Sequence, residues 1–165
     1  MSAKDKFVIM FVCTGNTCRS PMAEGALRVL LEKRRPGRFE VISSGTMAAD
    51  GYPATMYAQE AARLWDCDLS GHQSQMLNRL LIAKSDLILA MGPEHLQEVR
   101  YLAPEAAARA YLFKNFPDPS PNGERLEGPI GQSLDKYNET FLEIGEYLGK
   151  YVDEIVKRID EKLNA

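Results

Sequence analysis

Residues 7–21 of the chain read FVIMFVCTGNTCRSP, and this stretch combines an apolar run, a polar turn and the start of a helix. The apolar run is unbroken, which is typical of a parallel strand buried on both faces. In the turn, Gly15 permits backbone angles that other residues avoid, and Asn16 tolerates the left-handed region. Ser20 followed by Pro21 predicts a helix N-cap and the first helical residue. We therefore expect a strand that leads through a tight loop into a helix N-terminus.

The loop holds a thiol and a guanidinium, Cys13 and Arg19, with five residues between them. The helix N-terminus and successive loop N–H groups favour an anion inside the loop. The same field favours the thiolate form of Cys13, which is a strong nucleophile. Arg19 is able to bind two oxygens of a phosphoryl group at once. The pattern predicts a cysteine-dependent phosphatase, and the alternative is an inert buried cysteine beside a surface arginine. The predicted phosphate-binding residues are Thr14, Gly15, Asn16, Thr17, Cys18 and Arg19.

The composition is that of an ordinary globular domain. The 165 residues are 45% hydrophobic and 26% charged, which suits one core and a single domain spanning 1–165. A net charge of -3 implies no general affinity for nucleic acid or an anionic membrane. No apolar run approaches the ~20 residues of a membrane span, and the polar residues 1–6 lack a signal-peptide core. An odd count of three cysteines, with Cys13 in the reactive loop, indicates a reducing cytoplasm rather than a disulfide scaffold. We expect a cytoplasmic monomer.

Strand and helix patterns alternate along the chain. Further strands are predicted at 39–43, 86–91 and 110–113. Helices are predicted at 21–33, 54–66, 75–83, 93–102 and 133–163, the last with apolar residues at three- and four-residue spacing. Four strands alternating with helices predict an α/β fold, a three-layer sandwich with a central four-stranded parallel sheet and helices on both faces. Ligands of such sheets bind at the carboxyl ends of the strands, where the Cys13 loop lies.

The stretch VCTGNTCRSPMAE at residues 12–24 resembles the phosphate loop of the low-molecular-weight protein tyrosine phosphatase family. That family includes bacterial protein arginine phosphatases and thiol-dependent arsenate reductases. The likeness continues through SSGT at 43–46 and LSGH at 69–72, and it covers nearly the whole chain. It implies a phosphorylated protein as substrate, Cys13 as the nucleophile that forms a phosphocysteine, and no cofactor. The resemblance also implies residues that brace the loop, and these are Asn16, Ser20, Ser44 and His72.

The general acid is the point where the chain departs from this family, which places Asp-Pro in the loop before the last helix. The stretch EGPIGQS at 127–133 matches that loop better by position, and Gly128 then stands where the aspartate is expected. Asp118, within the literal Asp-Pro of Pro-Asp-Pro, is our candidate acid, with Glu127 as the alternative. The alternative interpretation of Asp118 is that of a turn residue, since Asp-Pro-Ser-Pro is typical of turns. If no residue replaces the acid, the chain is a weakly active phospho-binding protein.

Two features bear on the substrate, and they leave phosphotyrosine and phosphoarginine both open. Thr17 resembles the residue of the arginine phosphatases at its loop position, whereas bulkier aliphatic residues are typical of the tyrosine type. The alternative is that Thr17 only forms a hydrogen bond within the loop and has no role in substrate choice. Tyrosine-selective members carry aromatic residues after the acid's proline, and Ile130 offers no ring for stacking. Met47, Tyr52 and Tyr57 remain candidates for the pocket wall.

The other cysteines have separate interpretations. Cys18 either forms a reversible disulfide with Cys13 that protects the nucleophile, or serves as a small apolar residue at the loop end. Cys67 is interpreted as structural. Arsenate reductases of this fold need further thiols after the second buried strand, and residues 91–102 contain none. Arsenate reduction is therefore the least favoured of the three functions.

Overall fold

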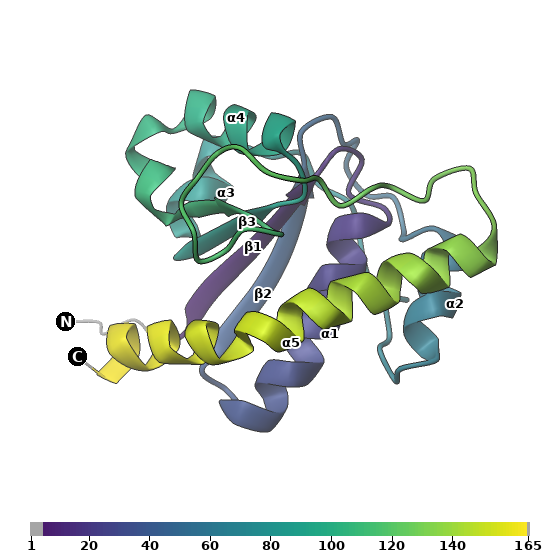
Figure 1. Ribbon diagram of the computed structural model, residues 1–165, viewed down its shortest axis with the longest axis horizontal. Helices are drawn as coiled ribbons and strands as arrows, with labels where there is room; N and C mark the ends of the chain where they lie inside the picture. The colour runs from purple at the N-terminus through teal and green to yellow at the C-terminus, as the bar shows by residue number, and fades with distance from the viewer. Residues whose placement is uncertain (1–4, 165) are drawn as a thin grey trace.

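The computed structural model describes residues 5–164, which alternate strand and helix as predicted (Figure 1). The N-terminal residues up to residue 4, part of the polar start of the chain, lie outside the described residues. The strands are β1 (Phe7–Cys13), β2 (Phe39–Gly45), β3 (Leu87–Ala90) and β4 (Ala110–Leu112). The helices are α1 (Arg19–Arg34), α2 (Met56–Arg63), α3 (Arg79–Lys84), α4 (Pro93–Leu102), the 3-10 helix η1 (Pro104–Arg109) and α5 (Leu134–Asn164).

The four strands form one parallel sheet in the order β2-β1-β3-β4, which confirms the predicted sheet. β1 is central, and every one of its residues is buried, as expected for a strand covered on both faces. Val12 lies opposite Ser44 of β2 and Ala90 of β3. The loop that follows β1 therefore emerges between the carboxyl ends of its two neighbours, at the edge where parallel sheets bind ligands.

Helices cover both faces of the sheet, so the three-layer prediction is confirmed. Side chains alternate along β1 between two cores. Ile9 and Phe11 pack with α1, α2 and α5 on one face, and Met10 and Val12 pack with α3 and α4 on the other. Figure 1 shows the long α5 lying across α1 on the first face, with α3 and α4 on the opposite side of the strands. Cys13 continues the alternation and belongs to the first core.

The start of α1 differs from the prediction in one informative way. The helix begins at Arg19, and its N-cap is Cys18, without a side-chain capping bond. Ser20 therefore lies inside the helix rather than at its N-cap. The reason is that its hydroxyl is engaged by the loop, where it contacts the sulfur of Cys13.

A long segment, the crossing loop (residues 113–133), connects β4 to α5. Figure 1 shows it passing over the end of the sheet that carries the Cys13 loop. It is tied to the sheet by hydrogen bonds from Phe113 N–H to the carbonyl of Ala90 (2.8 Å) and from Leu126 N–H to that of Met91 (2.8 Å). Within residues 5–164, no helix has the length and apolar character needed to cross a membrane.

Candidate active site

The loop at residues 13–19, here called the anion cup, turns its carbonyl groups outward. Four of its carbonyl groups accept hydrogen bonds from surrounding residues. Thr46 N–H donates to Cys13 (2.9 Å) and Met47 N–H to Thr14 (2.9 Å). His72 Nε2 donates to Asn16 (2.7 Å) and Thr55 N–H to Thr17 (2.9 Å). No group in the described part of the chain accepts from the N–H groups of Gly15, Thr17 or Cys18. With its carbonyls held from outside, the cup presents N–H groups to its interior, which is the arrangement of an anion nest.

Cys13 lies at the base of the cup, only 2% exposed. Its Sγ is 2.9 Å from the hydroxyl oxygen of Ser20 and accepts from the N–H of Asn16 at 3.3 Å. The hydroxyl of Ser20 itself accepts from the side-chain amide of Asn16 at 2.8 Å, so its proton is available to the sulfur. Two hydrogen-bonding groups, the hydroxyl of Ser20 in the first turn of α1 and the N–H of Asn16, therefore converge on this sulfur.

Asn16 is the residue that holds the cup in shape. Its φ of 59° is in the left-handed region, so the positive φ falls on Asn16 and not on Gly15. Its buried side chain donates to the hydroxyls of Ser20 (2.8 Å) and Ser43 (2.9 Å) and accepts from the N–H of Gln75 (2.9 Å). Only a few residue types adopt this backbone angle readily, and asparagine is one of them.

The prediction for Ser44 is wrong by one residue. Successive side chains of a strand point to opposite faces. Ser43 therefore faces the cup and bonds Asn16, whereas Ser44 faces the other core and donates to the sulfur of Met10 at 3.4 Å. The predicted brace His72 does reach the cup, since its Nε2 lies 2.7 Å from the carbonyl oxygen of Asn16.

Gly45 permits the close approach of β2 to the cup. A Cβ at this position would lie 2.4 Å from the carbonyl oxygen of Thr14 and 3.0 Å from the nitrogen of Asn16. Both are backbone atoms, so neither could move aside without displacing the cup. Any other residue at position 45 is therefore incompatible with this loop geometry.

The two terminal nitrogens of the Arg19 guanidinium are hydrogen-bonded within the described part of the chain, whereas its Nε is not. Nη1 donates to the carbonyl of Leu126 (3.1 Å) and Nη2 to the hydroxyl of Thr14 (3.3 Å). Nε is buried and has no hydrogen-bond partner among the described residues. A buried donor without a partner costs about 1–3 kcal/mol, which a bound oxyanion would offset. Gly128 lies against this edge, because a Cβ there would be 3.0 Å from Nε.

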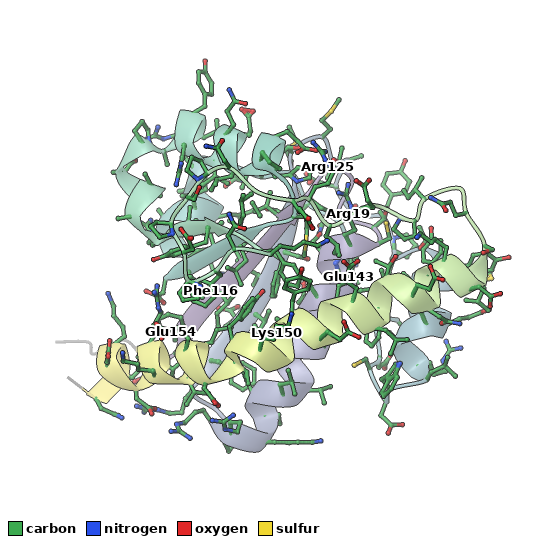
Figure 2. The ribbon with its side chains drawn as sticks, viewed as in Figure 1. Arg19, Phe116, Arg125, Glu143, Lys150 and Glu154 are labelled. Carbon is green, nitrogen blue, oxygen red and sulfur yellow. The ribbon has the colours of Figure 1, made fainter. Side chains whose placement is uncertain are left out.

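The cup opens into a cavity of about 460 Å³, a size typical of small-molecule sites. Its lining consists of the cup, Glu94 from α4, and Arg125, Glu127, Gly128 and Ile130 from the crossing loop. Figure 2 shows Arg19 and Arg125 at the same end of the sheet, where the crossing loop passes over it. Arg125 forms an ion pair with Glu94. No aromatic side chain belongs to this lining.

Several predicted candidates lie elsewhere. Asp118 is exposed, accepts from the N–H of Ser120 (2.9 Å) as a turn residue does, and does not line the cavity. Met47, Tyr52 and Tyr57 do not line it either. The structure therefore brings Glu127, and not Asp118, to the mouth of the cup.

Sequence analysis missed His95 of α4. Its Nε2 lies 2.8 Å from the hydroxyl oxygen of Thr14, and the ring is fully buried. Burial, reinforced by the charge of Arg19, lowers the pKa of His95 to about 4, so the ring is neutral near pH 7. The signal that could have found it is its position just after β3, because residues that follow a strand adjacent to β1 reach the same edge of the sheet.

The surroundings of Glu94 and Cys18 shift their pKa values and so determine their protonation states. Burial acts to raise the pKa of Glu94, but its own backbone N–H and the charge of Arg125 outweigh burial and lower that pKa below its usual value. Burial, together with the charge of Cys13, raises the pKa of Cys18 to about 11. Glu94 is therefore ionised and Cys18 a neutral thiol at physiological pH.

Comparison with known proteins gives consistent matches. The profile of the family described as "Low molecular weight phosphotyrosine protein phosphatase" matches residues 8–164. The low molecular weight protein-tyrosine-phosphatase Etp of Escherichia coli (strain K12) is 39% identical over 117 residues, 67% of this chain and 76% of that protein. A protein-arginine-phosphatase of Bacillus subtilis (strain 168) is 35% identical over 150 residues, 90% of this chain and 97% of that protein.

The fold has solved counterparts as well. One is the YwlE arginine phosphatase, in a mutant form with a phosphorylated active site serine. It superimposes on this chain with a TM-score of 0.84 at 32% identity, covering 93% of this chain and 99% of that one.

Proposed function

Because the chain belongs to the low molecular weight phosphotyrosine protein phosphatase family, we propose that it hydrolyses phosphoarginine in proteins through a phosphocysteine intermediate. The observation that carries the substrate assignment is the mouth of the cavity. Two carboxylates, Glu94 and Glu127, belong to its lining with the cation Arg125, which is paired with Glu94, and no aromatic ring does. Phosphoarginine joins a phosphoryl group to a cationic guanidinium, so it needs an anion cup beneath and negative charge above.

The chemistry proceeds in two displacements at phosphorus. The sulfur of Cys13 attacks in line, a P–S bond forms, and the P–N bond of phosphoarginine breaks with its electron pair going to nitrogen. Water then attacks the phosphocysteine and returns one proton to the acid that protonated the departing nitrogen, and inorganic phosphate leaves as the thiolate is restored. Arg19 and the inward N–H groups of the cup stabilise the equatorial oxygens in both steps. The neighbour with a phosphorylated active site serine supports a covalent phosphoenzyme.

We assign the general acid to Glu127. The departing nitrogen leaves at the mouth of the cup, where Glu127 lines the cavity beside Gly128. Glu94 is less suited, because its pKa is lowered and Arg125 holds it as the anion. Glu94 instead holds Arg125 at the mouth of the cavity, which leaves Glu127 as the carboxylate that faces the substrate guanidinium.

Phosphotyrosine is the second candidate substrate. Ile130 lines the cavity and is 60% exposed, so it offers an apolar contact to a ring although it cannot stack with one. Relatives such as Etp carry the name of tyrosine phosphatases.

The substrate proposal predicts a rate difference that depends on Thr17. We expect kcat/KM for a phosphoarginine peptide to exceed that for the matched phosphotyrosine peptide by about tenfold or more, and Thr17→Ile to reduce this ratio by about tenfold. The physical reason is that isoleucine fills the space above the cup with an apolar branch and removes a hydroxyl. Steady-state rates on the two peptides test both statements. A ratio that favours phosphotyrosine would reverse the assignment, and an unchanged ratio in Thr17→Ile would remove Thr17 from it.

A second prediction locates the acid. Glu127→Gln is expected to lower kcat on the phosphoarginine peptide by about 10²-fold, because general acid catalysis contributes ~10²–10⁴-fold. Nitrophenyl phosphate, with its good leaving group, should be affected least. Asp118→Asn is measured beside it, and Glu124→Gln is the matched control, since Glu124 lies on the same loop and does not line the cavity. A loss in Asp118→Asn with none in Glu127→Gln would assign the role to Asp118.

A further inference from the structure

The hydroxyl of Thr14 lies between two nitrogen groups that belong to different elements. Its Oγ1 is 3.3 Å from Arg19 Nη2 and 2.8 Å from His95 Nε2. An arginine guanidinium has no acceptor atom, so this contact uses one lone pair of the Thr14 oxygen. Whether His95 Nε2 donates to the Thr14 oxygen or accepts its proton then decides the direction of that hydroxyl proton.

The surroundings of His95 favour one position for its ring proton. The ring is fully buried, and Nδ1 has no hydrogen-bond partner among the described residues. The neutral ring thus leaves Nδ1 either as a buried N–H without an acceptor or as a buried acceptor without a donor. Among backbone groups, an unpaired buried N–H is rarer than an under-satisfied buried acceptor. Applied to this ring, the same preference favours the tautomer with the proton on Nε2, in which His95 is the donor to Thr14.

With donors on both lone pairs, the hydroxyl of Thr14 can act only as a donor in its remaining direction. Thr14 lines the anion cavity. We propose that His95 is a positioning residue which, together with Arg19, makes the Thr14 hydroxyl a fixed hydrogen-bond donor to the bound phosphoryl group. This inference rests on the proposed function, because it assumes that the cup holds a phosphoryl group.

The frame around His95 is rigid enough for this role. Its backbone N–H donates to the carbonyl of Gly92 (3.0 Å), in the first turn of α4. Its neighbours Leu96 and Val99 are buried in the core between α4 and the sheet. β3, which leads into α4, pairs directly with β1, which leads into the cup. The ring and the hydroxyl are therefore positioned by one continuous sheet.

The test measures the affinity of inorganic phosphate by titration calorimetry, which requires no turnover. Thr14→Val is expected to weaken binding about tenfold, since it removes a bond to a charged ligand but keeps the side-chain shape. His95→Leu should weaken it by a similar factor. His95→Gln, whose amide nitrogen can donate as Nε2 does, should retain most of the affinity. The double variant Thr14→Val with His95→Leu should bind no more weakly than Thr14→Val alone.

Two further measurements separate this role from simple loss of packing. Val99→Ala also removes buried volume from α4, and it should lower the melting temperature without changing phosphate affinity. Long-range ¹H–¹⁵N NMR of the histidine rings reports the tautomer, and the proton should be found on Nε2 of His95. A proton on Nδ1, or an undiminished effect of His95→Leu in the Thr14→Val background, would overturn the proposal. Its failure leaves the phosphatase assignment intact, because that depends on the loss of turnover in Cys13→Ser.

Discussion

Replacing Cys13 by serine is expected to lower kcat on nitrophenyl phosphate by about four orders of magnitude or more. Removing the nucleophile of a covalent hydrolase costs on the order of 10⁶ in kcat, and serine retains little of the reactivity of a thiolate. The donors around the sulfur, from Ser20 and from the N–H of Asn16, would remain. The loss is therefore chemical, and phosphate should still bind the variant.

The other two cysteines supply the comparison. Cys67 is buried, and burial, reinforced by the charge of Asp66, raises its pKa. Cys67→Ala is expected to keep kcat, and iodoacetamide at neutral pH should label Cys13 while Cys18 and Cys67 stay unmodified. Phosphate should protect Cys13 from this label. Comparable turnover by Cys13→Ser and the natural chain, or labelling of Cys67 first, would contradict the assignment of the nucleophile.

The fold could be predicted because its elements have strong local patterns. The apolar run before Cys13 and the run at 86–91 could only be buried strands, and the structure pairs them directly. The long apolar periodicity after Ser133 is α5, whose bounds differ from the prediction by one residue at each end. Errors fall on element ends, such as the start of α1, where the chemistry of the cup outweighs the usual capping preference.

Only those site residues that lie close together in the sequence could be predicted. The nucleophile, the arginine and the brace Asn16 belong to one loop of seven residues, so their spacing was sufficient. Ser43 was missed because resemblance alone does not settle which of two adjacent serines faces the cup, whereas strand alternation does. His95 and Arg125 reach the cup through tertiary packing from positions far along the chain. Their contribution depends on how the crossing loop and α4 meet, which no short pattern encodes.

Arg19→Lys is expected to lower kcat/KM by about 10³-fold, although the positive charge is conserved. The guanidinium makes two bonds within the protein, to Leu126 and Thr14, and still has its Nε edge for the substrate. A lysine ammonium is a point charge with three donors and cannot span these sites with one planar group. Loss of single preorganised donors in catalytic sites costs ~10²–10³-fold, and here a donor to the substrate and the clamp on the crossing loop are lost together.

Comparing Arg19→Lys with Arg125→Lys tests whether the effect at Arg19 comes from the geometry of its guanidinium rather than from its positive charge. Arg125→Lys alters a partly exposed ion pair at the mouth, so we expect a change in kcat/KM of less than about fivefold. Arg19→Lys should also weaken phosphate binding and lower the melting temperature, because the crossing loop loses its bond through Leu126. If Arg19→Lys and Arg125→Lys gave equal, small effects, the phosphoryl group would be held by net charge and backbone N–H groups alone. The planar fork of Arg19 would then have no special part in the reaction, and the two-sided clamp seen in the structure would serve only to join the loops.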